Sequence, residues 1–398
     1  MSADCDTDTV YIPPSTEHVS CVVCGGDEAI PVGTKGRFNM DVSSVACARC
    51  GLVYITPRPS MEDMARYYAT SYRVHYGSVG ALREDGSRIT PESADWEAYT
   101  DGRYQHQAKL IAPLIKPGAK VLEMGCRYGR TLSLLAQQHG VVPYGIEPGE
   151  ADAEKARQAG VECFTGTVEN YDPGETRFDL IQSFHVLEHV HDPLAVLLRL
   201  RSWLAPGGKL LVEVPNVHQP YGLLEGNFFQ NVHLFNFGPH TLSVLFKRAG
   251  LGDLRVIDDS TLFVMGEATG ANAETLPLPY APALHPNPSE AGEWMSLRLR
   301  AYADLEIARQ LLLSNDLRVE ILQATAHLLR GPCFSPHMAS VVGDLVEHFN
   351  RLGSPKIALI LVRAALAGPH PSDLKQGLAR LEQQLSAVDA ELAVAMAP

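Results

Sequence analysis

The middle of the chain alternates short apolar runs with amphipathic stretches. Apolar, β-branched runs predict strands at residues 120–124, 142–146, 161–165, 179–183 and 209–214, and helical spacing of apolar positions predicts helices at 131–139, 149–159 and 194–204. Strands separated by helices need crossover connections, so the pattern predicts a parallel sheet with helices on its faces. Two last apolar runs, 254–258 and 262–267, are expected to close the sheet as a hairpin-like pair.

The rest of the chain divides by pattern into four further segments. Residues 1–58 hold paired cysteines behind an acidic N-terminal tail, and residues 59–117 form a helical segment in which Tyr68, Tyr72 and Tyr76 recur on one helix face. We expect this tyrosine face to pack on the core or to line a substrate site. A domain at 118–270 then ends in a Pro-rich linker at 271–293, and Gly-Pro punctuation predicts an all-helical domain at 294–398.

Composition and charge narrow the classes of partner. The 398 residues include 46 acidic and 33 basic side chains, a formal net charge of −13, and a 45% hydrophobic content that suits two or three globular domains. Since no segment is basic, we expect no nucleic-acid partner. The apolar runs are too short to span a bilayer and the N-terminus is acidic, so we expect neither a membrane span nor a signal peptide.

Four cysteines form two C-x-x-C pairs, each followed by a glycine. They are Cys21, Cys24, Cys47 and Cys50, with Gly25 and Gly51 behind them. A glycine at this point permits the tight turn in which backbone N–H groups face the sulfur atoms, and two such turns complete a tetrahedral site. The pattern predicts a zinc ribbon with one structural zinc ion. Without a signal peptide it also favours a reducing, cytoplasmic location.

A glycine-containing turn follows the first predicted strand. Gly125 and Gly129 would let the backbone approach a ligand at the carboxyl end of that strand, where open α/β sheets bind cofactors. Glu147 ends the second strand, 24 positions after Glu123, an offset at which an acid can accept both hydroxyls of a ribose. No Gly-Lys-Ser/Thr follows the turn, which leaves adenosine ligands without a pyrophosphate.

These residues resemble the motifs of class I S-adenosylmethionine-dependent methyltransferases. The first motif corresponds to residues 123–129, the ribose-binding acid to Glu147, the adenine segment to 166–169, the fourth strand and its continuation to 178–190, and the turn before the fifth strand to 204–209. Arg127 stands where many members have a third glycine. The resemblance implies a Rossmann-like α/β fold, S-adenosylmethionine as cofactor, and cofactor contacts from Glu123, Gly125, Cys126, Gly129, Glu147, Pro148, Thr167, Val168, Ser183, Phe184 and His185.

The N-terminal region is similar to that of sugar C-methyltransferases. In those proteins a Glu-His pair after the fifth strand is catalytic, and the matching segment here, residues 231–237, keeps His233 but has Val232 in place of the glutamate. Those relatives also end in a second Rossmann-like domain, where this chain is predicted to be helical. Both departures weaken the case for C-methylation and leave methyl transfer itself expected.

Three histidines are candidates for the general base, because histidine exchanges protons near neutral pH. His233 comes first, since its segment should fold over the methyl group; His185 and His189 follow the fourth predicted strand. Each could instead pack structurally, as a pocket wall or against the adenosine. We expect Glu188 to orient a neighbouring histidine or backbone group.

The sequence thus predicts a cytoplasmic enzyme that transfers methyl from S-adenosylmethionine to a small polar acceptor, a sugar, a glycan or a secondary metabolite. O-methylation with a histidine base is the leading hypothesis. The alternatives are sugar C-methylation, RNA methylation, and a non-catalytic scaffold of methyltransferase fold. The C-terminal helices would serve a protein partner or self-association.

Overall fold

A computed structural model describes residues 15–76, 81–82, 88–89, 96–258 and 261–268, with 291–292, 295–296, 299, 379–380, 382–383 and 386. The predicted acidic tail, most of the Pro-rich linker and most of the C-terminal helical domain lie outside these residues.

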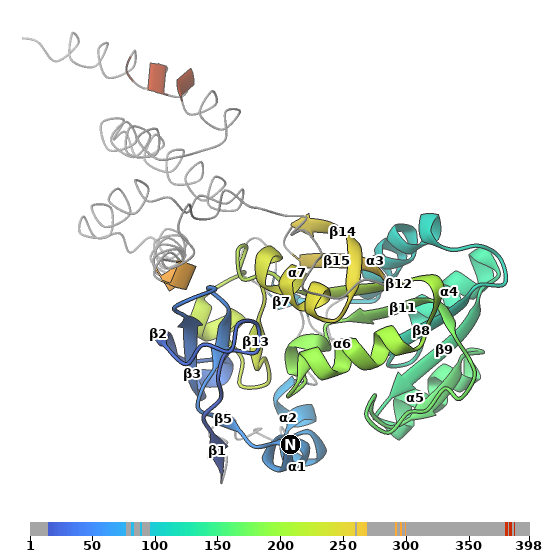
Figure 1. The fold of residues 1–398 in the computed structure, drawn as a ribbon, viewed down its shortest axis with the longest axis horizontal. Coiled ribbons are helices and arrows are strands. Elements are labelled where there is room, and N and C mark those ends of the chain that lie inside the picture. The colour runs from blue at the N-terminus through green and yellow to red at the C-terminus, as the bar shows by residue number, and fades with distance from the viewer. Residues whose placement is uncertain are drawn as a thin grey trace, which may run out of the picture.

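A seven-stranded sheet forms the centre of the fold (Figure 1). Its strands, in spatial order, are β10 (Glu162–Thr165), β9 (Val142–Glu147), β8 (Lys120–Met124), β11 (Phe178–Phe184), β12 (Leu204–Pro215), β15 (Thr261–Ala268) and β14 (Leu251–Asp258). The first five are parallel, and β15 runs antiparallel to both of its neighbours. The predicted parallel sheet and its closing antiparallel pair are therefore confirmed.

Helices cover both faces of the sheet, because the buried positions of each strand alternate between two cores. On β8, Val121 packs into one hydrophobic core and Leu122 into the other. The first core is shared with α3 (Trp96–Ile111), α4 (Arg130–His139) and α5 (Glu150–Gln158), and the second with α6 (Pro193–Ser202) and α7 (Pro239–Arg248). Helix α3 lies in the segment 59–117 that was expected to be helical, the sequence pattern did not single out α7, and residues 204–209, expected as a turn, are the start of β12 with an irregular register.

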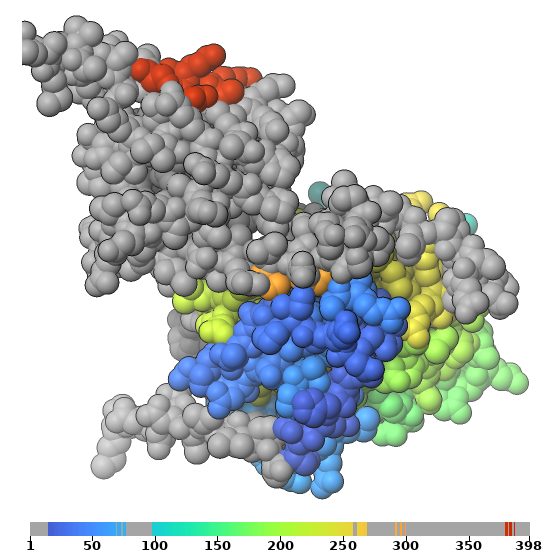
Figure 2. Space-filling view, turned by 60° about the vertical axis from the view of Figure 1, so that its left-hand side comes forward, coloured from blue at the N-terminus to red at the C-terminus, as the bar shows by residue number. Residues whose placement is uncertain are grey.

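The paired cysteines belong to a second, four-stranded sheet. Its spatial order is β13 (Phe235–Asn236), β4 (Val53–Ile55), β3 (Asp41–Cys47) and β2 (Ala29–Lys35), all antiparallel. Strand β13 follows β12 of the central sheet in the chain but pairs with β4, so this segment links the two sheets. Arg248 at the end of α7 also donates to the backbone carbonyls of Val22 and Val23, at 2.5 and 2.9 Å. Figure 2 shows the blue N-terminal segment lying against the green and yellow part of the molecule.

Short elements connect the two sheets. Strand β1 (Thr16–Glu17) pairs with β5 (Arg58–Pro59). After β5 the chain forms α1 (Met61–Thr70) and α2 (Tyr72–Tyr76). The remaining elements are the pair β6 (Ala81–Leu82) and β7 (Arg88–Ile89) and the short turns η1 (Arg37–Asn39), η2 (Ala112–Leu114), η3 (Leu187–His189) and η4 (Leu224–Phe228). In the part of the chain that is described, no helix combines the length and apolarity that a membrane span requires.

Candidate functional site

The strand order reverses between β8 and β11. From β8 the chain builds outward through β9 and β10, then returns to the opposite side of β8 with β11. Open α/β sheets bind ligands in the crevice outside the carboxyl ends of the two strands at such a reversal. Gly125 follows β8, Glu147 ends β9 and His185 follows β11, so three predicted site residues meet at this edge.

The turn after β8 needs its glycines. Gly125 and Gly129 have φ of +76° and +70°, in the left-handed region that favours glycine. A Cβ on Gly125 would lie 2.4 Å from Cγ2 of Val186, and one on Gly129 would lie 2.8 Å from Cγ2 of Val161. Arg127, which stands where a third glycine is common in the resembling family, also has a positive φ, +47°. The backbone therefore follows a glycine-rich path even where the side chain is arginine.

Glu147 is held by the backbone of that turn. Its Oε2 accepts from Arg127 N at 2.9 Å and its Oε1 from Gly149 N at 2.8 Å. Burial raises the pKa of this carboxyl although both N–H groups act in the other direction. The carboxylate is thus fixed at the carboxyl end of β9, where the sequence predicts a ribose-binding acid.

The other predicted cofactor residues lie around the same edge, in different settings. Gly166 N donates to Glu147 O at 3.0 Å, which brings the predicted adenine segment, with exposed Thr167 and buried Val168, beside the end of β9. Pro148, directly after Glu147, is exposed. Ser183 and Phe184 are buried at the end of β11, and the Ser183 hydroxyl has no hydrogen-bond partner in the described part of the chain. The Cys126 thiol lies 3.6 Å from that of Cys163 on β10, where it fills space beneath the turn.

Glu123 is buried at the end of β8. Burial raises the pKa of its carboxyl to about 8, despite a 2.9 Å hydrogen bond that Oε2 accepts from Gln182. The group is therefore mostly protonated at neutral pH.

The three candidate histidines gather around Glu188, in the turn after β11. Oε1 of Glu188 lies 3.5 Å from Nδ1 of His185 and 3.7 Å from Nε2 of His189, and the rings of His189 and His233 meet edge to face with centroids 4.8 Å apart. His233 reaches the cluster from the segment before β13. Residues far apart in the sequence are thus brought together, and Glu188 contacts two histidines as expected.

His185 is paired with a carboxylate and adopts a left-handed backbone, with φ of +54°. Its Nε2 lies 3.1 Å from Oε1 of Glu213 on β12, whose other oxygen accepts from Gln107 at 2.8 Å. Burial and Arg103 oppose the charged imidazole, but the carboxylates of Glu188 and Glu213 outweigh them and raise the pKa of His185. Of the three histidines it is the one best suited to carry a proton.

His189 and His233, in contrast, have lowered pKa values and are therefore neutral. Nδ1 of His189 donates to Val232 O at 2.9 Å and lies 3.0 Å from the Tyr68 hydroxyl, and burial lowers its pKa. Burial and the neighbouring His189 hold the pKa of His233 well below its usual range. Nδ1 of His233 is buried and has no hydrogen-bond partner among the described residues. An imidazole nitrogen of this kind is free to accept a proton or a cation.

The tyrosines of residues 59–117 stand beside this cluster. They lie on two helices, α1 and α2, rather than on one, because the helix breaks at Ser71. The stack continues across the break, with ring centroids 4.9 Å apart for Tyr68 and Tyr72 and 5.0 Å for Tyr72 and Tyr76. The Tyr68 hydroxyl lies 3.0 Å from Nδ1 of His189, and the Tyr76 hydroxyl donates to Asn231 Oδ1 at 2.9 Å.

Three residues of the site were not predicted from the sequence. Arg37 of η1 is 8% exposed, donates from Nη2 to Asn227 O at 2.8 Å and lies 5.9 Å from the Tyr76 ring centroid. Its buried Nε has no hydrogen-bond partner within the described segments. Glu213 and Tyr221 also face the histidines or Arg37. The local sequence around Arg37 does not identify it as a site residue, because its contacts with Asn227 and Tyr76 form only when the ribbon packs against those distant segments.

The four paired cysteines form a compact cluster. Their Sγ atoms all lie within 4.8 Å of one another, with 3.4 Å between Cys21 and Cys50 and 3.5 Å between Cys24 and Cys47. Gly25 and Gly51 have φ of +69° and +73°, and each donates its N–H to the carbonyl of the first cysteine of its pair. This is the turn that the spacing predicts, and the four thiolates would leave a metal no open position.

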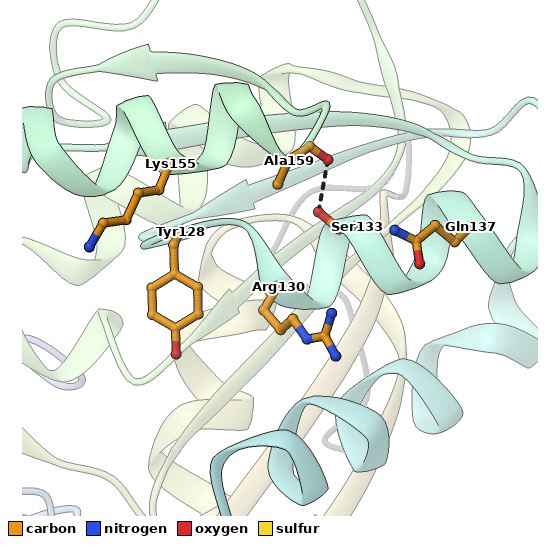
Figure 3. A pocket seen from close by; sticks show the side chains of 6 residues that line it. All are labelled: Tyr128, Arg130, Ser133, Gln137, Lys155 and Ala159. Atoms are coloured by element: carbon orange, nitrogen blue, oxygen red, sulfur yellow. Dashed lines mark hydrogen bonds between the residues drawn. The ribbon is translucent and has the colours of Figure 1, made fainter. Parts of the chain in front are cut away.

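A surface pocket between α4 and α5 is separate from this site. Figure 3 shows its lining side chains, Tyr128, Arg130, Ser133, Gln137, Lys155 and Ala159, with Ser133 donating to Ala159 O at 3.2 Å. It contains none of the candidate catalytic or cofactor residues, and we assign it no role.

Comparison with known proteins agrees with this fold. Residues 96–256 match a family model described as a methyltransferase domain. The chain is 28% identical over 181 residues to a tRNA U34 carboxymethyltransferase of Idiomarina loihiensis, covering 42% of this chain and 55% of the relative. It is 32% identical to a trans-aconitate 2-methyltransferase of Methylobacterium nodulans over 32% of this chain and 53% of that one. The chain thus spans about half the length of these curated relatives.

Among solved structures, a Burkholderia thailandensis 1,6-didemethyltoxoflavin-N1-methyltransferase with bound S-adenosylhomocysteine is 20% identical, with a TM-score of 0.40, over 55% of this chain and 96% of that one. A likeness of that size says nothing about the acceptor. The family match and the sheet order indicate that residues 96–256 form a methyltransferase domain with a Rossmann-like fold.

Proposed function

We propose that the chain transfers the methyl group of S-adenosylmethionine to a hydroxyl of a small polar acceptor, such as a sugar, a glycan or a secondary metabolite. The observation that carries this proposal is a cluster of buried histidines beside the turn where the cofactor would bind. Two of these histidines are neutral, and one has an unpartnered ring nitrogen among the described residues.

The cofactor half of the proposal rests on backbone geometry. Gly125 and Gly129 give the turn after β8 the left-handed conformation and close packing that a side chain would prevent, and Glu147 is oriented by two backbone N–H groups. The carboxylate would accept the ribose hydroxyls, and the methionine part would lie near the ends of β8 and β11, toward the histidines. The hydrogen bond from Arg127 N to Glu147 links the proposed ribose-binding acid directly to the glycine turn.

The chemistry requires alignment and removal of a proton. The acceptor oxygen attacks the methyl carbon in line with the S–CH3 bond, which breaks to leave neutral S-adenosylhomocysteine, and the hydroxyl proton passes to a histidine. Alignment contributes on the scale of about 7–11 kcal/mol seen for well-oriented reactions, and a general base adds about 10²–10⁴-fold. His233 is the first candidate, His189 the second, and His185, which is paired with Glu213, the third.

Sugar C-methylation is the second candidate, and one contact favours it. Val232 is buried at the position where the resembling C-methyltransferases have a glutamate, but Glu188 places a carboxylate 3.7 Å from His189. A carboxylate and a histidine are therefore together, as in that family, although they come from a different segment.

The ribbon is proposed to hold one structural zinc ion through Cys21, Cys24, Cys47 and Cys50. Four free thiols this close favour a reducing, cytoplasmic environment. Small molecules are the proposed partners, with no nucleic acid or membrane, and the C-terminal helices are the proposed surface for a protein partner or self-association.

Calorimetric titration with S-adenosylhomocysteine tests the cofactor site. We expect micromolar binding that weakens at least tenfold, about 1.4 kcal/mol, in Glu147→Ala and stays unchanged in Glu154→Ala, a nearby exposed acid. If the folded wild-type protein does not bind, the scaffold hypothesis replaces the enzyme.

Transfer of a labelled methyl group to free and nucleotide-linked sugars tests the chemistry. His233→Gln should lose at least about 10²-fold in kcat, while His240→Gln on α7 should not change it. The ¹³C chemical shift of the transferred methyl group in the NMR spectrum of the product separates O-methylation from C-methylation, since the two products have the same mass and only the first contains a methyl ether.

A further inference from the structure

Glu188, His189 and His233 form a second group with the composition of a metal site. Each offers one ligand atom, and these atoms all lie within 4.8 Å of one another. This group shares no residue with the cysteine cluster and lies at the proposed acceptor site instead.

The buried carboxylate of Glu188 is the first observation that points to a bound cation. Its side chain is 1% exposed, and neither carboxylate oxygen accepts a hydrogen bond from the described residues. Its ion-pair contacts among the described residues are long: His185, whose pKa it helps to raise, lies 3.5 Å away and His189 lies 3.7 Å away. A buried carboxylate is normally hydrogen-bonded or bound to a cation, because burial removes the water that stabilises its charge.

The two histidines are oriented as metal ligands are. The carbonyl of Val232 can only accept, so Nδ1 of His189 carries the hydrogen at 2.9 Å and Nε2, on the Glu188 side, has a free lone pair. A histidine that donates one ring N–H to a carbonyl and directs the other nitrogen inward is the usual arrangement around a bound metal. On His233, the buried Nδ1 lacks a partner among the described residues.

The spacing suits a transition metal. Bonds of about 2.0–2.2 Å place the ligand atoms of a tetrahedral site about 3.3–3.6 Å apart. Nε2 of His189 is already 3.7 Å from Oε1 of Glu188, and all three ligand atoms lie within 4.8 Å of one another. Two imidazoles and one carboxylate select zinc, iron, cobalt or nickel over magnesium or calcium, which prefer all-oxygen sites.

We propose that Glu188, His189 and His233 bind one divalent transition-metal ion, in addition to the ion of the cysteine cluster. Three protein ligands leave an open position, as in catalytic rather than structural sites. The His189 side chain is 18% exposed, while Glu188 and His233 are buried.

The inference deepens the proposed function and rests on it for its role. An acceptor hydroxyl bound at the open position would lose its proton to water more readily, because the cation stabilises the alkoxide. His233 would then hold the cation rather than take the proton. Metal binding itself can be measured whether or not methyl transfer is observed.

Metal content of the tag-free full-length protein tests the site. After equilibration with Zn²⁺ or Co²⁺ and desalting, elemental mass spectrometry should find two ions per chain in the wild type and in the control His240→Gln. Glu188→Gln and His233→Gln should each retain one, the ion of the cysteine cluster. Their cobalt spectra should keep the sulfur-to-metal charge-transfer bands and lose the bands of the nitrogen and oxygen site.

One ion per chain in the folded wild type overturns the proposal, as do two ions that persist in both variants. If a variant does not fold, the wild type decides: its second equivalent of cobalt must add absorption without further thiolate charge transfer, and the opposite result rejects the site. S-adenosylhomocysteine titration of the same samples keeps the outcomes distinct. Normal cofactor binding with one ion rejects the metal site and leaves the proposed function standing.

Discussion

At the scale of single residues, the site depends on groups whose surroundings change their ordinary properties. Arg127 and His185 adopt left-handed backbone conformations, Glu123 is a carboxyl that retains its proton, and His185 is paired with Glu213. Such departures cluster at functional sites, because strain and burial persist only where the surrounding structure enforces them. All four residues lie at the carboxyl edge of the central sheet or in the adjoining strand β12.

Gly125→Ala tests the turn after β8. The new Cβ would lie 2.4 Å from Val186 and would strain a φ of +76°, so we expect a loss of roughly 2–4 kcal/mol in the free energy of unfolding and of S-adenosylhomocysteine binding. Gly174 has φ of +58°, but a Cβ added there would meet nothing within 4 Å, so Gly174→Ala should cost only about 1–2 kcal/mol and leave binding intact. Equal effects in the two variants would argue against close approach at Gly125.

Glu123 predicts a pH dependence of stability. Its pKa is raised from 4.5 to about 8 in the folded protein, so between these values the folded state binds more protons than the unfolded one and stability falls as pH rises. Urea unfolding at pH 5 and pH 8 should show wild type losing about 2–4 kcal/mol relative to Glu123→Gln, whose amide does not titrate. The exposed control Glu175→Gln should follow the wild type. A constant difference between wild type and Glu123→Gln contradicts the protonated carboxyl.

At the scale of elements, the pairing of β13 with β4 joins the ribbon to the methyltransferase domain. Phe235 pairs with Tyr54, and Ile55 N donates to Leu234 O at 3.0 Å, directly after His233 in the chain. Thr34 and Lys35 of β2 also donate backbone N–H groups to Glu225, at 2.7 and 3.1 Å. The ribbon therefore supports the segment that carries His233 and contributes Arg37 to the same site.

Removing one ribbon cysteine should impair methyl transfer while leaving cofactor binding nearly unchanged. In Cys24→Ser the cluster loses one of its four thiols, and we expect weaker metal binding, a lower Tm and a loss of methyl transfer. Glu147 and Gly125 lie on the central sheet, so S-adenosylhomocysteine affinity should change less than about threefold. Calorimetry and the labelled-methyl assay on the same sample measure both effects. Parallel loss of cofactor binding and activity would show that the ribbon supports the whole domain instead.

At the scale of the whole molecule, charge bears on the choice between a small acceptor and RNA. The net charge of −13 opposes the phosphate backbone, and nonspecific binding needs cationic side chains to release counterions. One curated relative is a tRNA U34 carboxymethyltransferase, yet the likeness covers 42% of this chain. The acidic net charge therefore favours the small acceptor.

Fluorescence anisotropy with labelled bulk tRNA tests this expectation. At physiological salt we expect no binding tighter than about 100 μM, the weak limit for nonspecific binders. A basic nucleic-acid-binding protein in the same assay serves as the positive control. Micromolar binding that weakens steeply with added salt would favour RNA as the substrate.

Most of the central sheet and part of the site could be predicted from the sequence. Strand β8, the glycines after it, the acid at the end of β9 and the two cysteine turns are local features, since each depends on side-chain period or on a backbone conformation that a few neighbouring residues determine. Helix α3 was expected only as part of the helical segment 59–117, helix α7 was not predicted, and the single tyrosine helix was wrong because its break at Ser71 leaves the spacing unchanged.

The sequence by itself determined the class of domain, its glycine turn and the cysteine cluster, because these follow from patterns within short stretches of chain. Only the tertiary structure decided which side chains share the proposed acceptor site. His233, Glu188 and Tyr68 meet there, and Arg37 is brought from the ribbon, because β13 joins the ribbon sheet and α1 packs beside the turn after β11. Such contacts depend on packing between distant elements, and sequence spacing carries no information about that packing. The same packing buried Glu188 without a hydrogen bond from the described residues, the feature on which the second metal site rests.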